Sequence, residues 1–572
     1  MLDLAIKGGA VLDGSGSDAF TADIGIADGR IVEIGKVTTP ARRTIDADGA
    51  TVTPGFVDLH SHYDGQLTWG ERMSPSSDHG VTTVVTGNCG VGFAPCRPQD
   101  RARLINLMEG VEDIPELVLS EGLPWAWETF GEFADFVGAR RFDVDVGLQL
   151  PHSALRVYVM GERGAAREPA TDDELSAMQG IAADAMRLGA LGFATSNTLF
   201  HRTADGAPVP TQGAAERELI AIAGGLRQAG HGVIEMLIDL YAGDIDENVA
   251  RLARIERASG HGLSFTLAQA GPSSDSWRRA LAGIEAANAA GARVCGQVIG
   301  RPIGILIGHA LSYNCFFGCP SYAPLRDLPL HARIATLRTP EVRAALLAES
   351  PEASNQPIHA FARRFEQIFR VSRMIDYEPR ADRSVAALAV ERGVSPLEMA
   401  YDLLLEDDGH AILYAVIGNY MDGNLDYALE LMQHPNTILG LGDGGAHYGL
   451  ICDASYSTHM LTYWSRDRAA GRIPLAEVVR KLTSQPAEMV GLNDRGRIAL
   501  GRKADLNVLD HARMTLYAPR VTHDLPARGK RLVQPVDGYL ATIVDGAATY
   551  RHGVATGELP GRLIRGPQAL RQ

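Results

Sequence analysis

The chain has 572 residues, of which 45% are hydrophobic and 22% charged, so it can bury a large core and a disordered protein is excluded. Its 54 basic and 69 acidic residues give a net charge of −15, which argues against nucleic acid or anionic lipid as a partner. No apolar run approaches the roughly 18 residues that span a bilayer, which excludes a membrane protein. The start of the chain lacks the pattern of a secretion signal, so we expect a cytoplasmic protein.

Both ends of the chain have the texture of short alternating strands. Asp23–Ile26 and Arg30–Ile34 lie near the start, and Leu506–Leu509 lies near the end, each bounded by Gly or Asp turns. We predict that residues 1–54 and 490–572 together form a small β-sandwich domain. The six cysteines contain no C-x-x-C pair, so structural zinc and disulfides are not expected, and the cysteines should be buried thiols or site residues.

Between these ends, apolar strand-like runs alternate with helix-like stretches rich in Ala, Leu, Glu and Arg, which is typical of β/α units around a parallel sheet. The runs number eight: Pro54–Leu59, Val81–Thr86, Val144–Leu150, Gly189–Thr195, Val233–Ile238, Leu263–Ala268, Arg293–Val298 and Thr437–Gly442. They predict an α/β fold, a (β/α)8 TIM barrel over residues 55–489, whose chemistry lies at the C-terminal strand ends. Long insertions near 96–135 and 305–410 are expected to be lids or interface elements.

The first run ends in an H-x-H pair, His60 and His62. Alternate residues of a strand point to the same side, so the two imidazoles can hold one divalent ion at the rim of the barrel. The alternative is a pair of solvated histidines. The position after the first strand favours a metal site.

Two further strand ends carry chemistry. The second run leads into a Gly-flanked cysteine, Cys89, whose thiolate could share the ion; a buried structural cysteine is the alternative. The eighth run delivers Asp443 among glycines, where a carboxylate can bind metal and move a proton. Its alternative role is to cap the next helix.

These motifs, together with Met108–Pro115 (MEGVEDIP), Leu482–Ala487 (LTSQPA) and Gly501–Leu506 (GRKADL), resemble the N-acyl-D-amino-acid deacylases, or D-aminoacylases, of the amidohydrolase superfamily. The resemblance runs through nearly the whole chain. It implies a barrel with a flanking β-sandwich, one or two divalent ions with zinc as the expected metal, and hydrolysis of an amide by metal-bound water.

The resemblance also implies roles for single residues. The first-strand metal ligands of the family correspond to His60 and His62, its metal-sharing cysteine to Cys89, and its catalytic aspartate to Asp443. The family's histidines at the ends of strands five and six are absent. Glu235 could replace one of them as an oxygen ligand.

The lysines and the strand-six sequence narrow the chemistry further. No lysine lies between positions 37 and 480, so a carboxylated lysine cannot bridge two metals within the barrel strands, and Cys89 or Glu235 would have to do so. The basic residue that the family places just after strand six is also missing, because Ala270 follows Gln269. An amino-acid carboxylate is therefore not necessarily the group recognised.

Other rim residues are candidates for substrate binding. His152 could bind the substrate carbonyl and Arg156 a carboxylate, although a salt bridge is the commoner role of an arginine. Ser196 and Asn197 could line the pocket or be solvated loop residues. His309 lies in the loop after the seventh strand, where a lid or core packing would explain it equally.

The sequence thus predicts a metal-dependent hydrolase of a linear amide C–N bond, with Asp443 as general base and then acid, and a small-molecule amide as its partner. One alternative is cyclic-amide hydrolysis or other chemistry at a single-metal site with Glu235. Another is a catalytically silent barrel that serves as a binding or scaffold protein. The sequence leaves the subunit count open, and a homo-oligomer is compatible with it.

Overall fold

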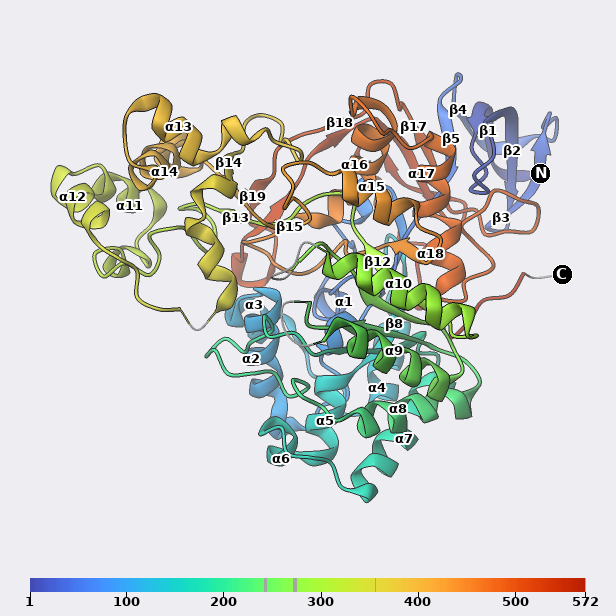
Figure 1. Ribbon diagram of the computed structural model, residues 1–572. Helices are drawn as coiled ribbons and strands as arrows, with labels where there is room; N and C mark the ends of the chain where they lie inside the picture. The colour runs from blue at the N-terminus through green and yellow to red at the C-terminus, as the bar shows by residue number, and fades with distance from the viewer. Residues whose placement is uncertain (241–243, 271–274, 355, 571–572) are drawn as a thin grey trace.

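A parallel sheet of eight strands organises the molecule. The computed structural model describes residues 1–240, 244–270, 275–354 and 356–570 (Figure 1). The strands follow the spatial order β16-β12-β11-β10-β9-β8-β7-β6. Their bounds are β6 Phe56–Asp58, β7 Val81–Thr86, β8 Asp145–Pro151, β9 Gly192–Ser196, β10 Val233–Leu237, β11 Leu263–Thr266, β12 Val294–Val298 and β16 Thr437–Leu439. Each overlaps one of the eight predicted runs, so the prediction of these strands is confirmed.

The two edge strands of this sheet meet just beyond their C-terminal ends. Ser61 and Gly444 form a parallel bridge. The amide of His62 donates to the carbonyl of Gly444 at 2.7 Å, and the amide of Asp443 donates to the carbonyl of His60 at 3.1 Å. The arrangement is consistent with the predicted (β/α)8 barrel, and it joins the first and eighth strand ends.

Amphipathic helices follow the strands and cover the sheet. All six residues of β7 are buried, as expected of a parallel strand covered on both faces. The helix α7 begins with a capping box in which Thr171 and Glu174 satisfy each other's backbone amides. The helices that follow the sheet strands or lie against the sheet are α5 His152–Met160, α7 Asp172–Arg187, α8 Glu216–Ala229, α9 Ile245–Ser259, α10 Ser276–Ala289, α15 Asp426–Gln433, α17 Leu475–Leu482 and α18 Ser484–Met489.

A second sheet, of nine strands, combines the two ends of the chain. Its N-terminal strands are β1 Leu2–Val11, β2 Phe20–Ala27, β3 Arg30–Gly35, β4 Ala41–Asp46 and β5 Thr51–Pro54. Its C-terminal strands are β17 Leu506–Leu509, β22 Tyr539–Val544, β23 Ala547–Arg551 and β24 Val554–Ala555. The antiparallel pairing of β5 with β17 joins the two ends, and Figure 1 shows the blue and red strands side by side.

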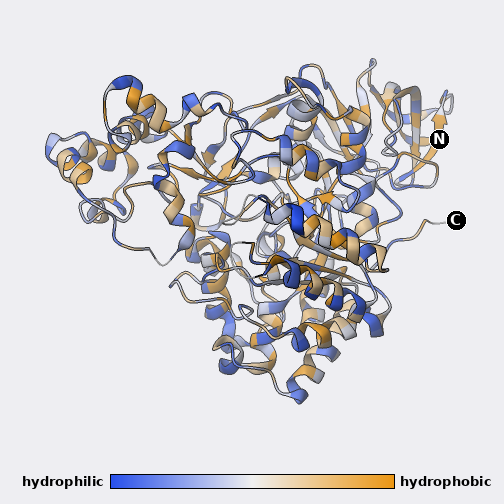
Figure 2. Cartoon of the chain, viewed as in Figure 1, coloured by the Kyte–Doolittle hydropathy of each residue, from blue (hydrophilic) through white to orange (hydrophobic). Residues whose placement is uncertain are grey.

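The predicted insertions contain regular structure. The first carries α2 Arg101–Glu112, α3 Glu116–Gly122 and α4 Phe130–Gly138. The second forms the yellow lobe at the left of Figure 1 and has its own buried apolar cluster. Figure 2 shows hydrophobic segments in orange within this lobe. Its elements are the sheet β13 Ile303–Ile307, β15 Leu413–Gly418 and β14 Ile368–Arg370, and the helices α11 Leu330–Leu337, α12 Pro340–Ala348, α13 Val385–Arg392 and α14 Pro396–Leu404.

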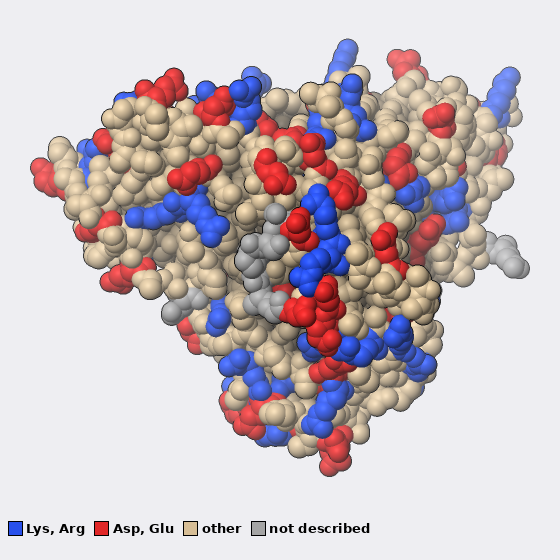
Figure 3. All heavy atoms as spheres, in the orientation of Figure 1, with Lys and Arg blue, Asp and Glu red and all other residues tan. Residues whose placement is uncertain are grey.

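The distribution of charge on the surface and the state of the cysteines can be compared with the expectations from the sequence. Figure 3 shows acidic and basic side chains interspersed over the visible face. Among the helices that the structure describes, none has the length and apolar character needed to cross a bilayer. All six cysteines are free thiols, and five of them are buried.

A buried ion cluster ties the C-terminal segment to the barrel at the start of β8. Asp145 accepts from the Arg495 guanidinium at 2.6 Å and lies 3.0 Å from the Lys503 ammonium. The side chain of Arg495 is only 4% exposed. Removing one partner of such a buried pair leaves an uncompensated charge, which costs more than the pair itself contributes.

We therefore expect Arg495→Met to lower the free energy of unfolding by about 3–5 kcal/mol, measured by chemical denaturation. Arg497→Met is the matched control, because Arg497 lies two residues away, is 38% exposed and sits 3.9 Å from Asp13. The control should change stability by less than about 1 kcal/mol. Equal losses in the two variants would contradict the assignment.

Candidate metal centre

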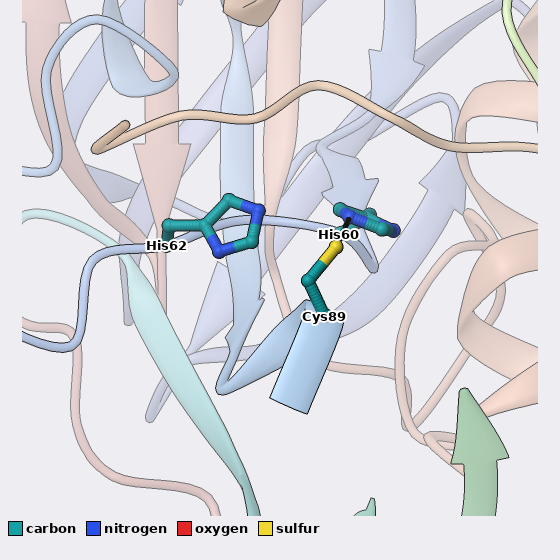
Figure 4. A group of neighbouring side chains, drawn as sticks. All are labelled: His60, His62 and Cys89. Carbon is teal, nitrogen blue, oxygen red and sulfur yellow. Dashed lines mark hydrogen bonds between the residues drawn. The ribbon is translucent and has the colours of Figure 1, made fainter. Parts of the chain in front are cut away.

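The end of β6 presents two imidazoles toward one point. His60 and His62 are each about 1% exposed, and their ring centroids lie 5.4 Å apart. Both Nε2 atoms lie 3.4 Å from the same oxygen, Oδ1 of Asp443. Figure 4 shows His60 beside the sulfur of Cys89, with His62 on the same side of the strand end. The H-x-H pair is therefore buried at the junction of the first and eighth strand ends.

Cys89 comes from the short turn Asn88–Gly90 that follows β7. Its backbone is left-handed, with φ at 54°, and its Sγ lies 3.5 Å from Nε2 of His60. A Cβ on Gly90 would come within 2.8 Å of the Cα of Thr195. Glycine at that position lets the turn lie against β9 and hold the thiol over the histidines.

Asp443 is placed by a tight loop after β16. Its own φ is 48°, and the next residue, Gly444, leaves no room for a side chain, because a Cβ there would lie 2.2 Å from Oγ of Ser76. The side chain of Asp443 is 19% exposed, whereas those of His60 and His62 are 2% or less. The approach from solvent is therefore on the Asp443 side.

Polar partners orient both imidazoles from behind. Nδ1 of His60 lies 2.8 Å from Oε1 of Gln297, whose amide donates to Oγ of Ser264. Nδ1 of His62 lies 3.3 Å from Oε1 of the buried Glu112. The Gln297 oxygen places a proton on Nδ1 of His60 and leaves its Nε2 lone pair facing Asp443. Glu112 lies close to Nδ1 of His62, although the two atoms make no hydrogen bond in this structure, and its position favours the same tautomer.

The buried acidic groups of the centre have shifted pKa values, in opposite directions for different residues. Burial, reinforced by the nearby carboxylate of Glu235, raises the pKa of the Cys89 thiol well above its ordinary value. Burial, reinforced by the charge of Asp443, likewise raises the pKa of Glu112. Although burial opposes its ionisation, the neighbouring imidazoles of His62 and His60 hold the pKa of Asp443 below its ordinary value. Within the described part of the chain, no lysine or arginine pairs with these acids.

Two observations indicate that these residues could hold a divalent ion: the distances between their ligand atoms, and the buried polar atoms that have no hydrogen-bond partner in the described part of the chain. The two 3.4 Å separations between Nε2 and Oδ1 exceed the roughly 3.2 Å of a good hydrogen bond. They match the separation of about 3.3–3.6 Å between nitrogen and oxygen ligands that lie about 2.0–2.2 Å from one tetrahedral zinc ion. Ligand atoms of His60, His62 and Cys89 lie within 4.8 Å of one another. Buried atoms without hydrogen-bond partners among the described residues surround them: Nδ1 of His62, Oε2 of Glu112 and Oε1 of Glu235.

Glu235 lies beside this group on β10. Its Oε2 accepts from the backbone amide of Cys89 at 3.0 Å, and its Oε1 lies 3.8 Å from Nδ1 of His60. The side chain therefore faces the Nδ1 edge of His60. Gln269, near the end of β11, is engaged elsewhere, because its amide donates to Oδ2 of Asp422 at 3.1 Å.

The predicted substrate-binding residues have protein partners of their own. Nδ1 of His152 lies 2.7 Å from Oγ1 of Thr195, and its Nε2 lies 2.9 Å from Oε1 of Glu218. The guanidinium of Arg156 also pairs with Glu218, and both side chains are buried. The structure thus gives His152 and Arg156 a shared carboxylate partner, and their contact with substrate stays a prediction.

Ser196 and Asn197 lie at the end of β9, in the loop that the sequence places after strand four. Ser196 is buried. Oδ1 of Asn197 accepts from the backbone amide of Gly213 at 2.8 Å, which fixes the turn that follows. Their predicted role in lining the pocket stays a prediction.

Three residues of the centre were not among the predicted site residues. Glu112 lies between His62 and His447, with its Oε2 3.4 Å from Nε2 of His447. Glu112 belongs to the segment Met108–Pro115, which resembles the deacylase family but was not assigned a site residue. His447 lies four residues after Asp443. Gln297 lies inside the strand β12, and no local pattern distinguishes it from a core glutamine.

A model of the amidohydrolase family matches residues 43–550. The chain belongs to the amidohydrolase family. The D-aminoacylase of Alcaligenes xylosoxydans xylosoxydans is 27% identical over 98% of this chain and 97% of its own length. The N-acyl-D-glutamate deacylase of the same organism is 27% identical over 99% of this chain and 96% of its own length. The resemblance that the motifs predicted is confirmed.

The fold is also similar to solved structures. One of them is a structure of D-aminoacylase, which superposes with a TM-score of 0.63. That enzyme has a binuclear metal centre in which one metal activates and the second attenuates. It is 25% identical, and the match covers 99% of this chain and all of that one. This neighbour supports a divalent metal in an amidohydrolase of this kind.

The contact between Glu112 and His62 predicts a loss of metal affinity in Glu112→Gln. The substitution keeps the side-chain shape but replaces the carboxyl group near Nδ1 of His62 by an amide, a weaker acceptor, so zinc should bind roughly 10–100-fold more weakly. Competition with a chromogenic chelator measures the dissociation constant. Glu109→Gln is the control, because its Oε1 accepts only from the amide of Glu116 on the protein surface. Wild-type affinity in both variants would contradict the role of Glu112.

Proposed function

We propose that this amidohydrolase uses a divalent ion, with zinc as the expected metal, to hydrolyse a linear amide such as an N-acylated amino acid. The observation that carries the proposal is the convergence of His60, His62 and Cys89 with the carboxylate of Asp443 at the closure of the parallel sheet. The similarity to D-aminoacylase and N-acyl-D-glutamate deacylase over nearly the full length of the chain supports the substrate class.

His60 and His62 would hold the ion through Nε2, with Cys89 and Asp443 completing the ligands and Glu235 as a further oxygen donor. When bound, a divalent ion supplies positive charge that polarises the amide carbonyl and makes water more acidic. The carboxylate of Asp443 takes a proton from the attacking water and returns it to the leaving amine. Its depressed pKa keeps it ionised at neutral pH, so it is ready to act first as a base.

Gln297 and Glu112 act through the histidines. Each contacts an Nδ1 atom and so fixes which ring nitrogen is available as a ligand. The surrounding burial excludes bulk water from the ligand atoms, which strengthens the electrostatic interactions among them. The chain therefore contributes orientation and a dry environment as well as the proton-transferring group.

The proposal extends to the finer architecture. We infer a (β/α)8 barrel domain over residues 55–489, with a β-sandwich domain formed from residues 1–54 and 490–572. The sheet order, the Ser61–Gly444 bridge and the pairing of β5 with β17 support this division. The expected partner is a small-molecule amide, and the candidates for binding it are His152, Arg156, Ser196 and Asn197. The expected compartment is the cytoplasm, because the first residues lack the pattern of a secretion signal.

A panel of substrates with one matched variant tests the function. The purified, zinc-loaded protein should release free amine from N-acetyl-D-amino acids. Asp443→Asn should lower kcat by at least about 10²-fold, because it removes the proton-transferring carboxylate. Metal content measured by mass spectrometry should stay largely unchanged in this variant, since three other ligands remain.

Three outcomes would contradict the proposal in distinguishable ways. Activity on cyclic imides and lactams alone would reject the linear amide. Full activity in Asp443→Asn would remove that residue from proton transfer. Less than about 0.2 ion per chain, with no gain on adding Zn²⁺ or Mn²⁺, would favour a catalytically silent barrel.

A further inference from the structure

A basic cleft of about 910 Å³ lies between the lobe formed by the second insertion and the C-terminal segment. Helix α11 lies on one side, and the strand β19 Arg520–Thr522 lies on the other. Four arginine or lysine side chains line it, together with four histidines and, among the described residues, one carboxylate. These charged residues are Arg333, Arg338, Arg520, Lys530 and Asp408.

The charge of the cleft is opposite to that of the whole chain. Four cations against one carboxylate leave an excess of three positive charges, with the histidines neutral, in a protein whose net charge is −15. Concentrating one sign of charge in a concave, partly desolvated space raises the local potential and attracts counter-ions. The cleft is therefore electrostatically suited to an anion.

Two of these cations have hydrogen-bonding capacity left. The side chain of Arg520 makes no ion pair or hydrogen bond with any described residue. The ammonium of Lys530 donates to the carbonyl of Ala310 at 2.7 Å, which leaves two of its three N–H groups. Arg338 is paired with Asp408 at 3.0 Å. Arg333 is fixed by backbone carbonyls, among them that of His309 at 2.7 Å, and contributes mainly charge.

His309 lines the cleft and has a buried ring nitrogen without a hydrogen-bond partner among the described residues. The hydroxyl oxygen of Tyr322 accepts a hydrogen bond from the Asn314 amide at 2.8 Å. The same hydroxyl can donate its proton to Nδ1 of His309, which lies 3.0 Å away. Burial, reinforced by the charge of Arg333, lowers the pKa of His309 to about 3, so the ring is neutral. Its remaining proton is then on Nε2, which is buried and has no partner among the described residues.

We propose that this cleft binds a small oxyanion of at least two negative charges, borne by a phosphate group or by several carboxylates. Arg520 and Lys530 donate to the anion, and Arg333 and Arg338 add to the attractive potential. The volume lies in the range of roughly 300–1,000 Å³ that small-molecule sites occupy. This binding function goes beyond the proposed amide hydrolysis.

The cleft is separate from the metal centre, since it shares no lining residue with the ligands His60, His62, Cys89 and Asp443. The two sites are connected by a short chain of contacts. The segment that supplies Ala310 to Lys530 also supplies Ser312, whose hydroxyl lies 3.0 Å from Oδ2 of Asp113, the neighbour of Glu112. Arg520 and Lys530 do not belong to the proposed metal ligands or proton-transferring groups, so variants at these positions change the cleft and leave the catalytic residues in place.

Isothermal titration calorimetry on the full-length, zinc-loaded protein tests the proposal in 150 mM NaCl. The probes are glucose 6-phosphate for the phosphate source and tricarballylate for the carboxylate source, because both are weak chelators. At least one should bind with a Kd below about 1 mM. Arg520→Gln should raise that Kd by at least 5-fold, and the double variant Arg520→Gln with Lys530→Gln by at least 10-fold.

Arg513→Gln is the matched control, because this arginine lies in the same C-terminal segment, is 89% exposed and is outside the cleft. It should bind the probe as the wild type does. Amide hydrolysis and thermal stability of Arg520→Gln should equal those of the wild type, which separates failure of this site from failure of the proposed function. The proposal is overturned if neither probe binds, if the control weakens binding equally, if binding is insensitive to Arg520, or if hexaglutamate alone binds.

Discussion

The structure depends on the junction between the first and eighth strands of the parallel sheet. Two backbone hydrogen bonds, from the amide of Asp443 to the carbonyl of His60 and from the amide of His62 to the carbonyl of Gly444, join these strand ends. They bring the side chain of Asp443 beside two imidazoles that lie 383 and 381 residues earlier in the sequence. Without this junction the carboxylate and the histidines would have no fixed relation, and the proposed proton transfer would lack its geometry.

Burial at the junction leaves several acidic groups without a compensating charge from the described residues. The thiol of Cys89 and the carboxylate of Glu112 have raised pKa values, and the described residues offer them no lysine or arginine as a partner. A divalent ion would compensate these groups together, which couples metal binding to their ionisation and to the order of the site. Glu112 would then orient His62, because its Oε1 lies beside Nδ1 of that ring. Its Oε2 lies near His447 and makes no hydrogen bond with the described residues.

Much of this arrangement could be predicted from local sequence patterns. The strands, the H-x-H pair and the aspartate after the eighth strand follow from apolar runs and from the rule that strand ends carry chemistry. Glu112 and Gln297 could not be predicted, because their contacts with His62 and His60 join segments 50 and 237 residues apart. The sequence also shows no sign that Glu218 pairs with both His152 and Arg156, since residues on different helices meet only through tertiary packing.

Anomalous diffraction at the zinc absorption edge, from crystals of the zinc-loaded protein, tests the central claim most directly. The account predicts a peak between Nε2 of His60, Nε2 of His62 and Oδ1 of Asp443, within about 2.0–2.3 Å of its ligand atoms. A map without a peak at this junction, with the imidazoles and the carboxylate turned apart, would contradict it.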